Sequence, residues 1–187
     1  MKAALSGILL LVFAAGVAQA ATPFELYELG KYDAAITSGI AQNDAAGFAI
    51  AARSELAREA MQKERCLECI RRAQEDARKA IAADPRNADA HVFLAIALGR
   101  EGRLLSTLTV LRRGYPTQAK AELDTAIAAD SDNAFAWGAL AGWNIELVHK
   151  GGARLASALY GASVASGLTD FNKAFALAPD NIALRYQ

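Results

Sequence analysis

The stretch Ala80-Ile81-Ala82-Ala83-Asp84-Pro85-Arg86-Asn87-Ala88 recurs in recognisable form further along the chain. The related stretches are Ala126-Ile127-Ala128-Ala129-Asp130-Ser131-Asp132-Asn133-Ala134 and Ala174-Phe175-Ala176-Leu177-Ala178-Pro179-Asp180-Asn181-Ile182, with a weaker copy at Gly39-Ile40-Ala41-Gln42-Asn43. The equivalent residues Ile40, Ile81, Ile127 and Phe175 are 41, 46 and 48 residues apart. A fixed pattern at such intervals indicates a repeated structural unit.

Each stretch predicts the end of one helix and the beginning of the next. Its alanine-rich part favours helix, and Pro85 or Pro179 then stops it, because proline lacks an N–H and clashes with the preceding turn. The Asp and Asn residues that follow favour a turn and the cap of another helix. The unit is therefore a helix, a tight turn and a second helix, and several units would stack.

The composition agrees with closely packed helices. Alanine accounts for 44 of the 187 residues, aromatic residues for 7%, and only four residues are proline. These values disfavour a β-sandwich, a disordered chain and a disulfide-dense small protein. The formal net charge is zero, with 20 basic and 20 acidic residues and no polybasic run, so we expect no nucleic-acid partner.

The first twenty residues have the pattern of a secretory signal peptide. Lys2 precedes the apolar run 8–15, and Ala18-Gln19-Ala20 has the small-x-small form of a cleavage site. The apolar stretch 3–17 is shorter than the roughly 20 residues that span a bilayer. We expect cleavage after Ala20, one repeat domain over residues 21–187 without a membrane span, and a periplasmic or secreted location in a Gram-negative bacterium.

The repeats resemble the tetratricopeptide repeat, whose first helix carries a bulky residue, Leu, a small residue and Tyr at spacings of three, one and three. First-helix positions are matched by His91, Leu94, Ala95 and Leu98, and by Trp137, Leu140, Ala141 and Asn144, where Asn144 departs from the pattern. Second-helix positions are matched by Ala73, Ala77, Ala80 and Pro85, by Ala119, Leu123, Ala126 and Ser131, and by Gly167, Phe171, Ala174 and Pro179. The resemblance implies an all-α solenoid of stacked antiparallel helical hairpins.

The period is longer than the 34 residues usual for tetratricopeptide repeats. The additional residues fall between paired helices, at 103–116 and 145–166, where they would lengthen the hairpin or add a short helical turn. A period near 46 also fits HEAT-type repeats. The Asp-Pro-x-Asn-Ala punctuation at 84–88 favours the tetratricopeptide type over that alternative.

The C-terminal part carries a more particular resemblance. A helix with Trp137 and Trp143, the link Ser157-Ala158-Leu159-Tyr160-Gly161 and the helix through Phe171 are similar to the tetratricopeptide-like domain of the regulator of microtubule dynamics family. An exported bacterial protein would not meet microtubules, so that role does not transfer. A weaker resemblance is to the periplasmic helical partner of TRAP-type solute transporters, against which the lack of a lipobox cysteine counts.

The chain ends on a segment that begins like another first helix, Ile182-Ala183-Leu184-Arg185-Tyr186-Gln187. A helix with an unpaired apolar face is a poor end for a stack, which normally needs a capping element. We therefore expect that the native chain continues past Gln187 or that a partner completes the stack.

Cys66 and Cys69 lie three residues apart in a helical stretch. A c-type haem site would need His where Ile70 stands, and a zinc site would need a second ligand pair. Two interpretations stay open: an intramolecular disulfide, as an oxidising compartment allows, and free thiols packed in the core.

The sequence offers little for catalysis or metal binding. Its two histidines are His91, at the bulky position of a repeat helix, and His149, three residues after Glu146. Phosphate-binding loops, hydrolase nucleophile elbows and zinc-protease motifs are missing from it. We expect no enzyme activity, no metal and no cofactor.

The predicted function is a scaffold for protein–protein interactions, because tetratricopeptide solenoids, by resemblance, bind peptides or partner helices in a concave groove. The second, fifth, ninth and twelfth repeat positions would line it: Asp89, Val92, Ile96, Gly99, Phe135, Gly138, Gly142 and Ile145. Alternatively, Gly138 and Gly142 only allow neighbouring helices to pack tightly. The alternative function is a small-molecule-binding or TRAP-transporter-associated protein with a cavity around Trp137, Trp143 and Tyr160.

Overall fold

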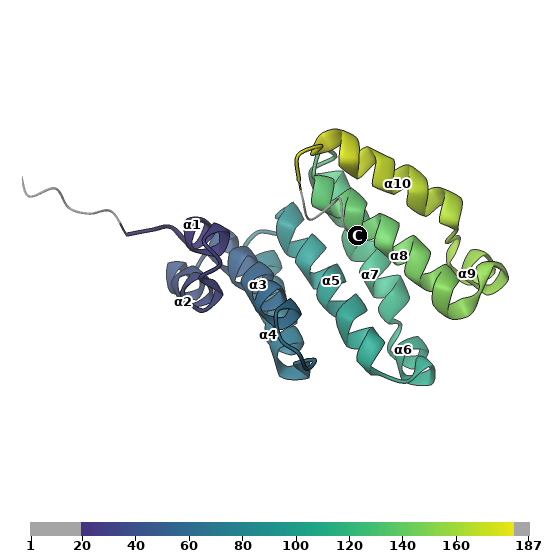
Figure 1. Cartoon of the computed structure of the whole chain (residues 1–187), viewed down its shortest axis with the longest axis horizontal. Helices are drawn as coiled ribbons and strands as arrows, with labels where there is room; N and C mark the ends of the chain where they lie inside the picture. The colour runs from purple at the N-terminus through teal and green to yellow at the C-terminus, as the bar shows by residue number, and fades with distance from the viewer. Residues whose placement is uncertain (1–19, 182–187) are drawn as a thin grey trace, which may run out of the picture.

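The computed structural model describes residues 20–181, and over this range the chain is all-α (Figure 1). The helices are α1 (Pro23–Glu28), α2 (Tyr32–Gln42), α3 (Ala45–Ala60), α4 (Leu67–Ala83), α5 (Ala88–Leu104), α6 (Thr107–Arg113), α7 (Tyr115–Ala129), α8 (Ala134–Gly151), α9 (Ala153–Tyr160) and α10 (Val164–Leu177). Nearly all of the expected leader and the expected opening of a further helix at 182–187 lie outside the described residues. Within the described range, no helix is both long enough and apolar enough to cross a bilayer.

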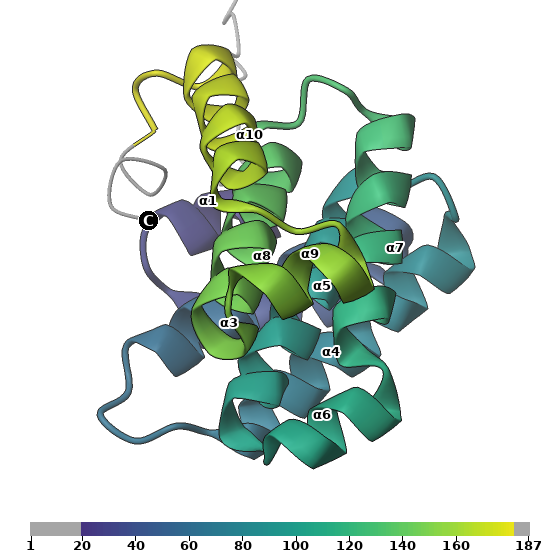
Figure 2. The ribbon, with the colours of Figure 1, turned by 90° about the vertical axis from the view of Figure 1, so that its right-hand side faces the viewer.

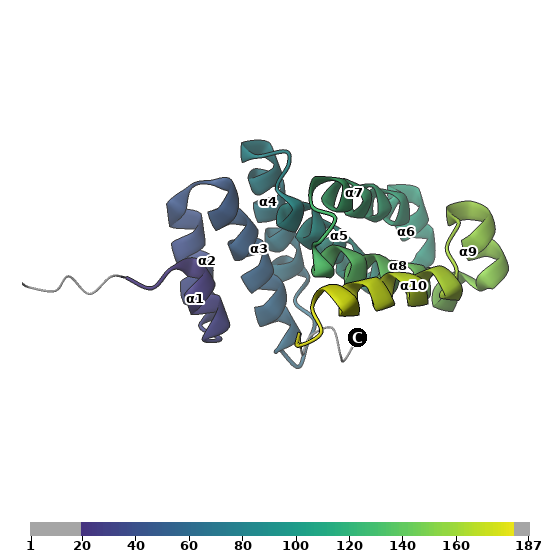
Figure 3. The same cartoon turned by 90° about the horizontal axis from the view of Figure 1, so that it is seen from above.

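The helices form antiparallel hairpins that stack along the long axis of the molecule (Figures 1 and 3). The hairpins pair α3 with α4, α5 with α7, and α8 with α10, while the shorter pair α1 and α2 precedes them. The additional residues of the second and third hairpins form the separate short helices α6 and α9. Figure 2, viewed from the C-terminal end, shows α9 and α10 in front of the stack. The predicted all-α solenoid is confirmed.

The recurring turn and cap residues make the same hydrogen bonds in successive repeats. Asn87 caps α5 by accepting the N–H of Ala90 at 2.9 Å, and Asn133 caps α8 by accepting the N–H of Ala136 at 3.0 Å. Asp84 and Asp130 precede them, and each accepts a backbone N–H two residues on, at 2.9 and 3.0 Å. The repeat is thus visible in sequence because the turn and cap require particular side chains.

The core lies between hairpins and is built largely from alanine. Ala73, Ala77 and Ala80 on one face of α4 are fully buried, and larger side chains such as Leu98 and Leu123 fill the space between α5 and α7. Small residues let helix axes approach closely while the fold still reaches the packing density of a protein interior. Alanine richness is therefore a packing feature of this solenoid as well as a helix preference.

The contact between α2 and α3 depends on two glycines. A Cβ atom at Gly39 would lie 2.5 Å from the carbonyl oxygen of Gly47, and one at Gly47 would clash with the carbonyl oxygen of Gly39. No L side chain fits at such distances without moving the backbone. This close crossing fixes α2, and with it α1, against the first full hairpin.

Candidate interaction face

The first helices of the three hairpins, α3, α5 and α8, contact one another in that order and form one continuous face. An arginine on α3, Arg53, reaches rings on the other two helices. The guanidinium carbon of Arg53 lies 4.3 Å from the ring centroid of Tyr27, 4.8 Å from that of Phe135, 5.7 Å from that of Phe93 and 5.8 Å from that of Phe24. These rings come from α1, α5 and α8, so the arginine joins helices far apart in sequence. We call Arg53 and these four rings the Arg53 cluster.

The caps of the first helices determine which residues reach this face. Asp44 caps α3 as Asn87 caps α5 and Asn133 caps α8. Arg53 lies nine residues after its cap, as do Ile96 and Gly142 in the following hairpins. The large side chain of Arg53 therefore projects from a position at which the next two helices carry smaller residues.

Arg53 differs from the other arginines of its neighbourhood in its partners. Among the described residues, no carboxylate pairs with Arg53 and its guanidinium N–H groups form no hydrogen bond. Arg58 and Arg72, by contrast, both bind Glu55, and Arg100 binds Glu59 at 2.9 Å. The ring faces around Arg53 stabilise its positive charge by cation–π attraction, which leaves its hydrogen-bonding edge free.

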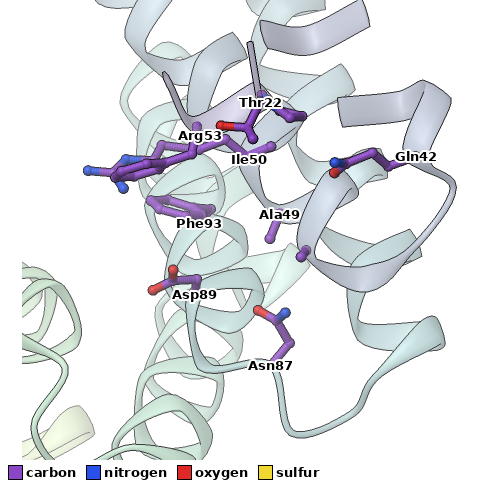
Figure 4. A pocket seen from close by; sticks show the side chains of 11 residues that line it. Thr22, Gln42, Ala49, Ile50, Arg53, Asn87, Asp89 and Phe93 are labelled. Carbon is purple, nitrogen blue, oxygen red and sulfur yellow. The ribbon is translucent and has the colours of Figure 1, made fainter. Parts of the chain in front are cut away.

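A pocket of about 300 Å³ lies beside the cluster, between α1, the end of α2 and the beginnings of α3 and α5 (Figure 4). Figure 4 shows the ring of Phe93 between Arg53 and Asp89 in that view. Most of the wall is apolar, and the rest comes from polar side chains that include the guanidinium of Arg53. It consists of Thr22, Pro23, Phe24, Gln42, Ala46, Ala49, Ile50, Arg53, Asn87, Asp89 and Phe93.

Six of the eight predicted groove residues lie where a partner could reach them. Asp89 lines the pocket and Phe135 belongs to the Arg53 cluster. Ile96 is half-buried, whereas Gly99, Gly142 and Ile145 are exposed. All six therefore offer surface on or beside the face of α3, α5 and α8.

The other two, Val92 and Gly138, are buried inside the stack, and Val92 has no exposed surface. Both occupy the fifth repeat position, which here points towards neighbouring helices. They offer no surface to a partner, and their assignment to the groove is corrected accordingly.

For Gly142, the structure also separates the two interpretations, open space on the face and tight helix packing. A Cβ atom at Gly99 or Gly142 would meet no heavy atom within 4 Å, so close helix packing does not require glycine there. Tight packing against α8 depends instead on Gly167 of α10, where a Cβ would lie 2.8 Å from the side chain of Ile145. Gly99 and Gly142 leave open space on the floor of the face.

Sequence reasoning missed Arg53, Phe93 and the α1 rings. The repeat that contains α3 has the weakest pattern, so none of its residues was assigned to the groove. Asp44 was the available signal: interpreted as a helix cap equivalent to Asn87, it would have placed Arg53 in line with Ile96. Nothing in the local sequence marks Phe24 and Tyr27, which reach the cluster through tertiary packing.

The cysteines lie away from this face, at the beginning of α4. The structure contains a disulfide between Cys66 and Cys69. Cys66 is also the helix cap, since its sulfur accepts the N–H of Cys69 at 3.1 Å. The guanidinium of Arg72 lies 3.5 Å from the sulfur of Cys69.

The histidines occupy packing and surface positions. The ring nitrogens of His91 lie 2.5 Å from a carboxylate oxygen of Glu122 and 3.0 Å from the carbonyl oxygen of Pro85, while His149 is exposed. Over residues 20–181, no group of three or more potential His, Cys, Asp or Glu ligands is placed to hold a metal ion.

The aromatic residues proposed for a small-molecule cavity pack into helix contacts. The indole N–H of Trp143 donates to the carbonyl oxygen of Pro116 at 2.9 Å, and its ring meets Tyr160 edge to face with centroids 6.3 Å apart. The indole N–H of Trp137 donates to the carbonyl oxygen of Ser131 at 2.8 Å. These rings thus help to hold the third hairpin on the second.

Comparison with known proteins agrees with the helical repeats described above. The family described as regulator of microtubule dynamics protein 1-3 matches residues 46–186, which include nearly all of α3 and every later helix. The chain belongs to this family. The resemblance seen in the C-terminal helices is confirmed, and this regulator of microtubule dynamics family match extends it through the first two full hairpins. No curated protein matches the chain.

Among solved structures, the chain is similar to a thermophilic TPR protein from the bacterium Thermus thermophilus. The two share 21% sequence identity with a TM-score of 0.56, and the match covers 87% of this chain and 91% of that one. This likeness shows a TPR fold, and it decides between the tetratricopeptide and HEAT alternatives in favour of the former.

Proposed function

We propose that this member of the regulator of microtubule dynamics family is an exported, non-catalytic scaffold that holds partner proteins on the face formed by α3, α5 and α8. The observation that carries the proposal is the Arg53 cluster with its adjoining pocket. Here a cation without a carboxylate partner among the described residues, several aromatic rings and open glycine positions share one surface. A stack of helical hairpins presents such a surface as a binding face.

The polar groups on this face support binding of a partner without catalysis. The pocket polar groups are an arginine, an aspartate, two side-chain amides and the hydroxyl of Thr22, which already caps α1. Asp89 accepts a hydrogen bond from the side-chain amide of Asn133 at 2.9 Å, which fixes its orientation. Preformed polar groups at the edge of an apolar surface are typical of sites that orient a bound chain.

The exported location is proposed from the leader-like sequence of residues 1–20. Thr22 is the cap of α1, so a cut between Ala20 and Ala21 would leave the first helix and its cap intact. The disulfide of Cys66 and Cys69 suits an oxidising compartment. These features support export and are independent of the argument for the binding face.

Fractionation tests the location directly. The full chain, expressed in a Gram-negative host, should appear in the periplasmic or extracellular fraction with Ala21 as its N-terminal residue. Retention in the cytoplasm with Met1 or Lys2 at the N-terminus would contradict export and would leave the binding face untouched.

Site-directed photo-crosslinking tests the scaffold role. A photoreactive residue at Ile145, which is 42% exposed on α8, should crosslink a small set of discrete proteins in intact cells. Thr125, exposed on α7, is the matched control and should not yield the same products. Identical products from both positions, or a small molecule retained through purification with no protein product, would contradict the scaffold and favour the small-molecule alternative.

A further inference from the structure

We infer that the face of α3, α5 and α8 binds an internal, extended segment of a partner through an acidic side chain, which Arg53 holds between the aromatic rings of its cluster. This inference rests on the proposed function and names the chemistry of the partner. It follows from three features. Arg53 has no carboxylate partner among residues 20–181, aromatic rings surround it, and open space lies next to the cluster.

The fold pairs its other central arginines and carboxylates with one another. The buried carboxylate of Glu59 binds Arg65 at 3.3 Å and Arg100 at 2.9 Å, and that of Glu101 binds Arg71 and Arg113. Arg53 lies among these helices, yet within residues 20–181 it has no such partner. The face is therefore left with an unpaired positive charge, which a carboxylate from another chain would complement.

The rings restrict how that carboxylate can approach. Two rings lie close to the guanidinium, with Tyr27 at 4.3 Å and Phe135 at 4.8 Å between centroid and guanidinium carbon, and they occupy space through which an acceptor could otherwise approach. The N–H groups lie in the guanidinium plane, so an acceptor must come in at the edge. A carboxylate satisfies this geometry with two parallel hydrogen bonds, which a neutral amide cannot match in strength.

Open space at two places on the face favours an internal segment over a chain terminus. Beside Arg53, the 300 Å³ pocket, with Ile50 and Phe93 in its wall, can take an apolar side chain. Further along α5 and α8 than Phe93 and Phe135, Gly99 and Gly142 leave room for a backbone, and Ile145 is exposed three residues after Gly142. A partner chain would therefore extend past the cluster, from the pocket to these glycines.

The charge of Asp89 restricts which residue of that segment can enter the pocket. Asp89 lines the pocket, and no described lysine or arginine pairs with its carboxylate. A second acidic residue in the pocket would be repelled. The bound segment should thus combine one acidic residue with a neighbouring apolar residue.

A displayed library of random dodecapeptides, held inside a carrier protein so that neither end is free, provides the probe. The full chain is expressed and purified in the form that its host produces. It should enrich peptides in which Asp or Glu neighbours a large apolar residue. The most enriched peptide would then be synthesised with blocked ends and titrated by fluorescence anisotropy against the wild type and against Arg53→Gln, Arg53→Lys and Asp89→Asn.

We expect Arg53→Gln to weaken binding about tenfold or more, and an acid-to-amide change in the peptide to weaken it similarly. Combining the two changes should cost little beyond either one, as a direct pair requires. Arg53→Lys should recover part of the affinity, and Asp89→Asn should not reduce it. Unfolding curves of every variant separate lost binding from lost folding.

Other outcomes overturn the inference in distinguishable ways. Enriched peptides without acidic bias, or equal binding by folded Arg53→Gln, would reject the acidic-segment inference and leave the scaffold proposal standing. Binding that requires a free terminal carboxylate would reject the internal segment. Failure to enrich any peptide would reject the inference, and if Ile145 also gives no specific crosslink, the proposed function fails with it.

Discussion

At the scale of single residues, several carboxylates are buried by the stacking of helices. Asp76 on α4 is almost fully buried, and this burial raises the pKa of its carboxyl group, while the hydrogen bond from Lys79 at 3.1 Å acts in the opposite direction. Asp170 has a raised pKa for the same main reason, partly offset by its hydrogen bond from Asn144. Such groups make stability depend on pH.

The sign of this dependence follows from the raised pKa of Asp76. A folded state with the higher pKa binds its proton more tightly than the unfolded state, so the contribution is full below the unfolded value of about 3.9 and is lost as pH rises through the folded pKa. Relative to Asp76→Asn, the wild type should therefore lose unfolding free energy as the pH rises from about 4 through the raised pKa of Asp76. Urea unfolding at several pH values measures this difference, and Asp132→Asn, at an exposed position, controls for the loss of one charge. A pH-independent difference would contradict the prediction.

At the scale of helices, the closest crossing is that of α2 with α3. Gly47→Ala should destabilise the protein by about 1–3 kcal/mol, because the added methyl group has to displace backbone atoms. Gly99→Ala is the matched control: its Cβ would contact nothing, and alanine favours helix by about 0.5–1 kcal/mol over glycine. Thermal or urea unfolding compares the two variants. Equal stability of both would contradict the tight crossing.

The beginning of α4 gives a second prediction at this scale. The disulfide between Cys66 and Cys69 closes a very short loop, so reduction should lower the unfolding free energy by about 2 kcal/mol or less. Unfolding in the presence and absence of a thiol reductant measures the change. The double variant Cys66→Ser, Cys69→Ser should not respond to reductant. Two reactive thiols in the unreduced, denatured protein would instead support the free-thiol interpretation.

At the scale of the whole molecule, the stack exposes two kinds of surface, the face of α3, α5 and α8 and the outer surface of the second helices. Gly142→Leu should abolish partner binding without loss of stability, because its side chain would fill the open floor of the face. Ala128→Leu, on the outer surface of α7, should leave partner binding intact. The crosslinked products from Ile145 and the unfolding curves report the two effects. Unchanged crosslinking in Gly142→Leu would place the binding surface elsewhere.

The architecture could be predicted from sequence because the turns and caps depend on local side chains. Asn87 and Asn133 cap their helices as the repeat pattern requires, and the additional residues of the longer repeats fall where it placed them. The face was predicted less completely. Val92 was assigned by the register of the usual repeat, whereas the packing of this stack buries the fifth repeat position, and Arg53 acquires its rings only through tertiary packing.

Arg53 has a further consequence for the mechanics of the solenoid. Repeat proteins can extend and bend along their length because each unit contacts only its neighbours. Here one side chain touches rings on α1 and α8, which belong to the first and last helix pairs described. Extension of the stack would pull these rings away from Arg53, so the cation–π contacts of the cluster oppose extension. A partner bound on this face, as we propose, would meet a surface whose width these contacts restrain.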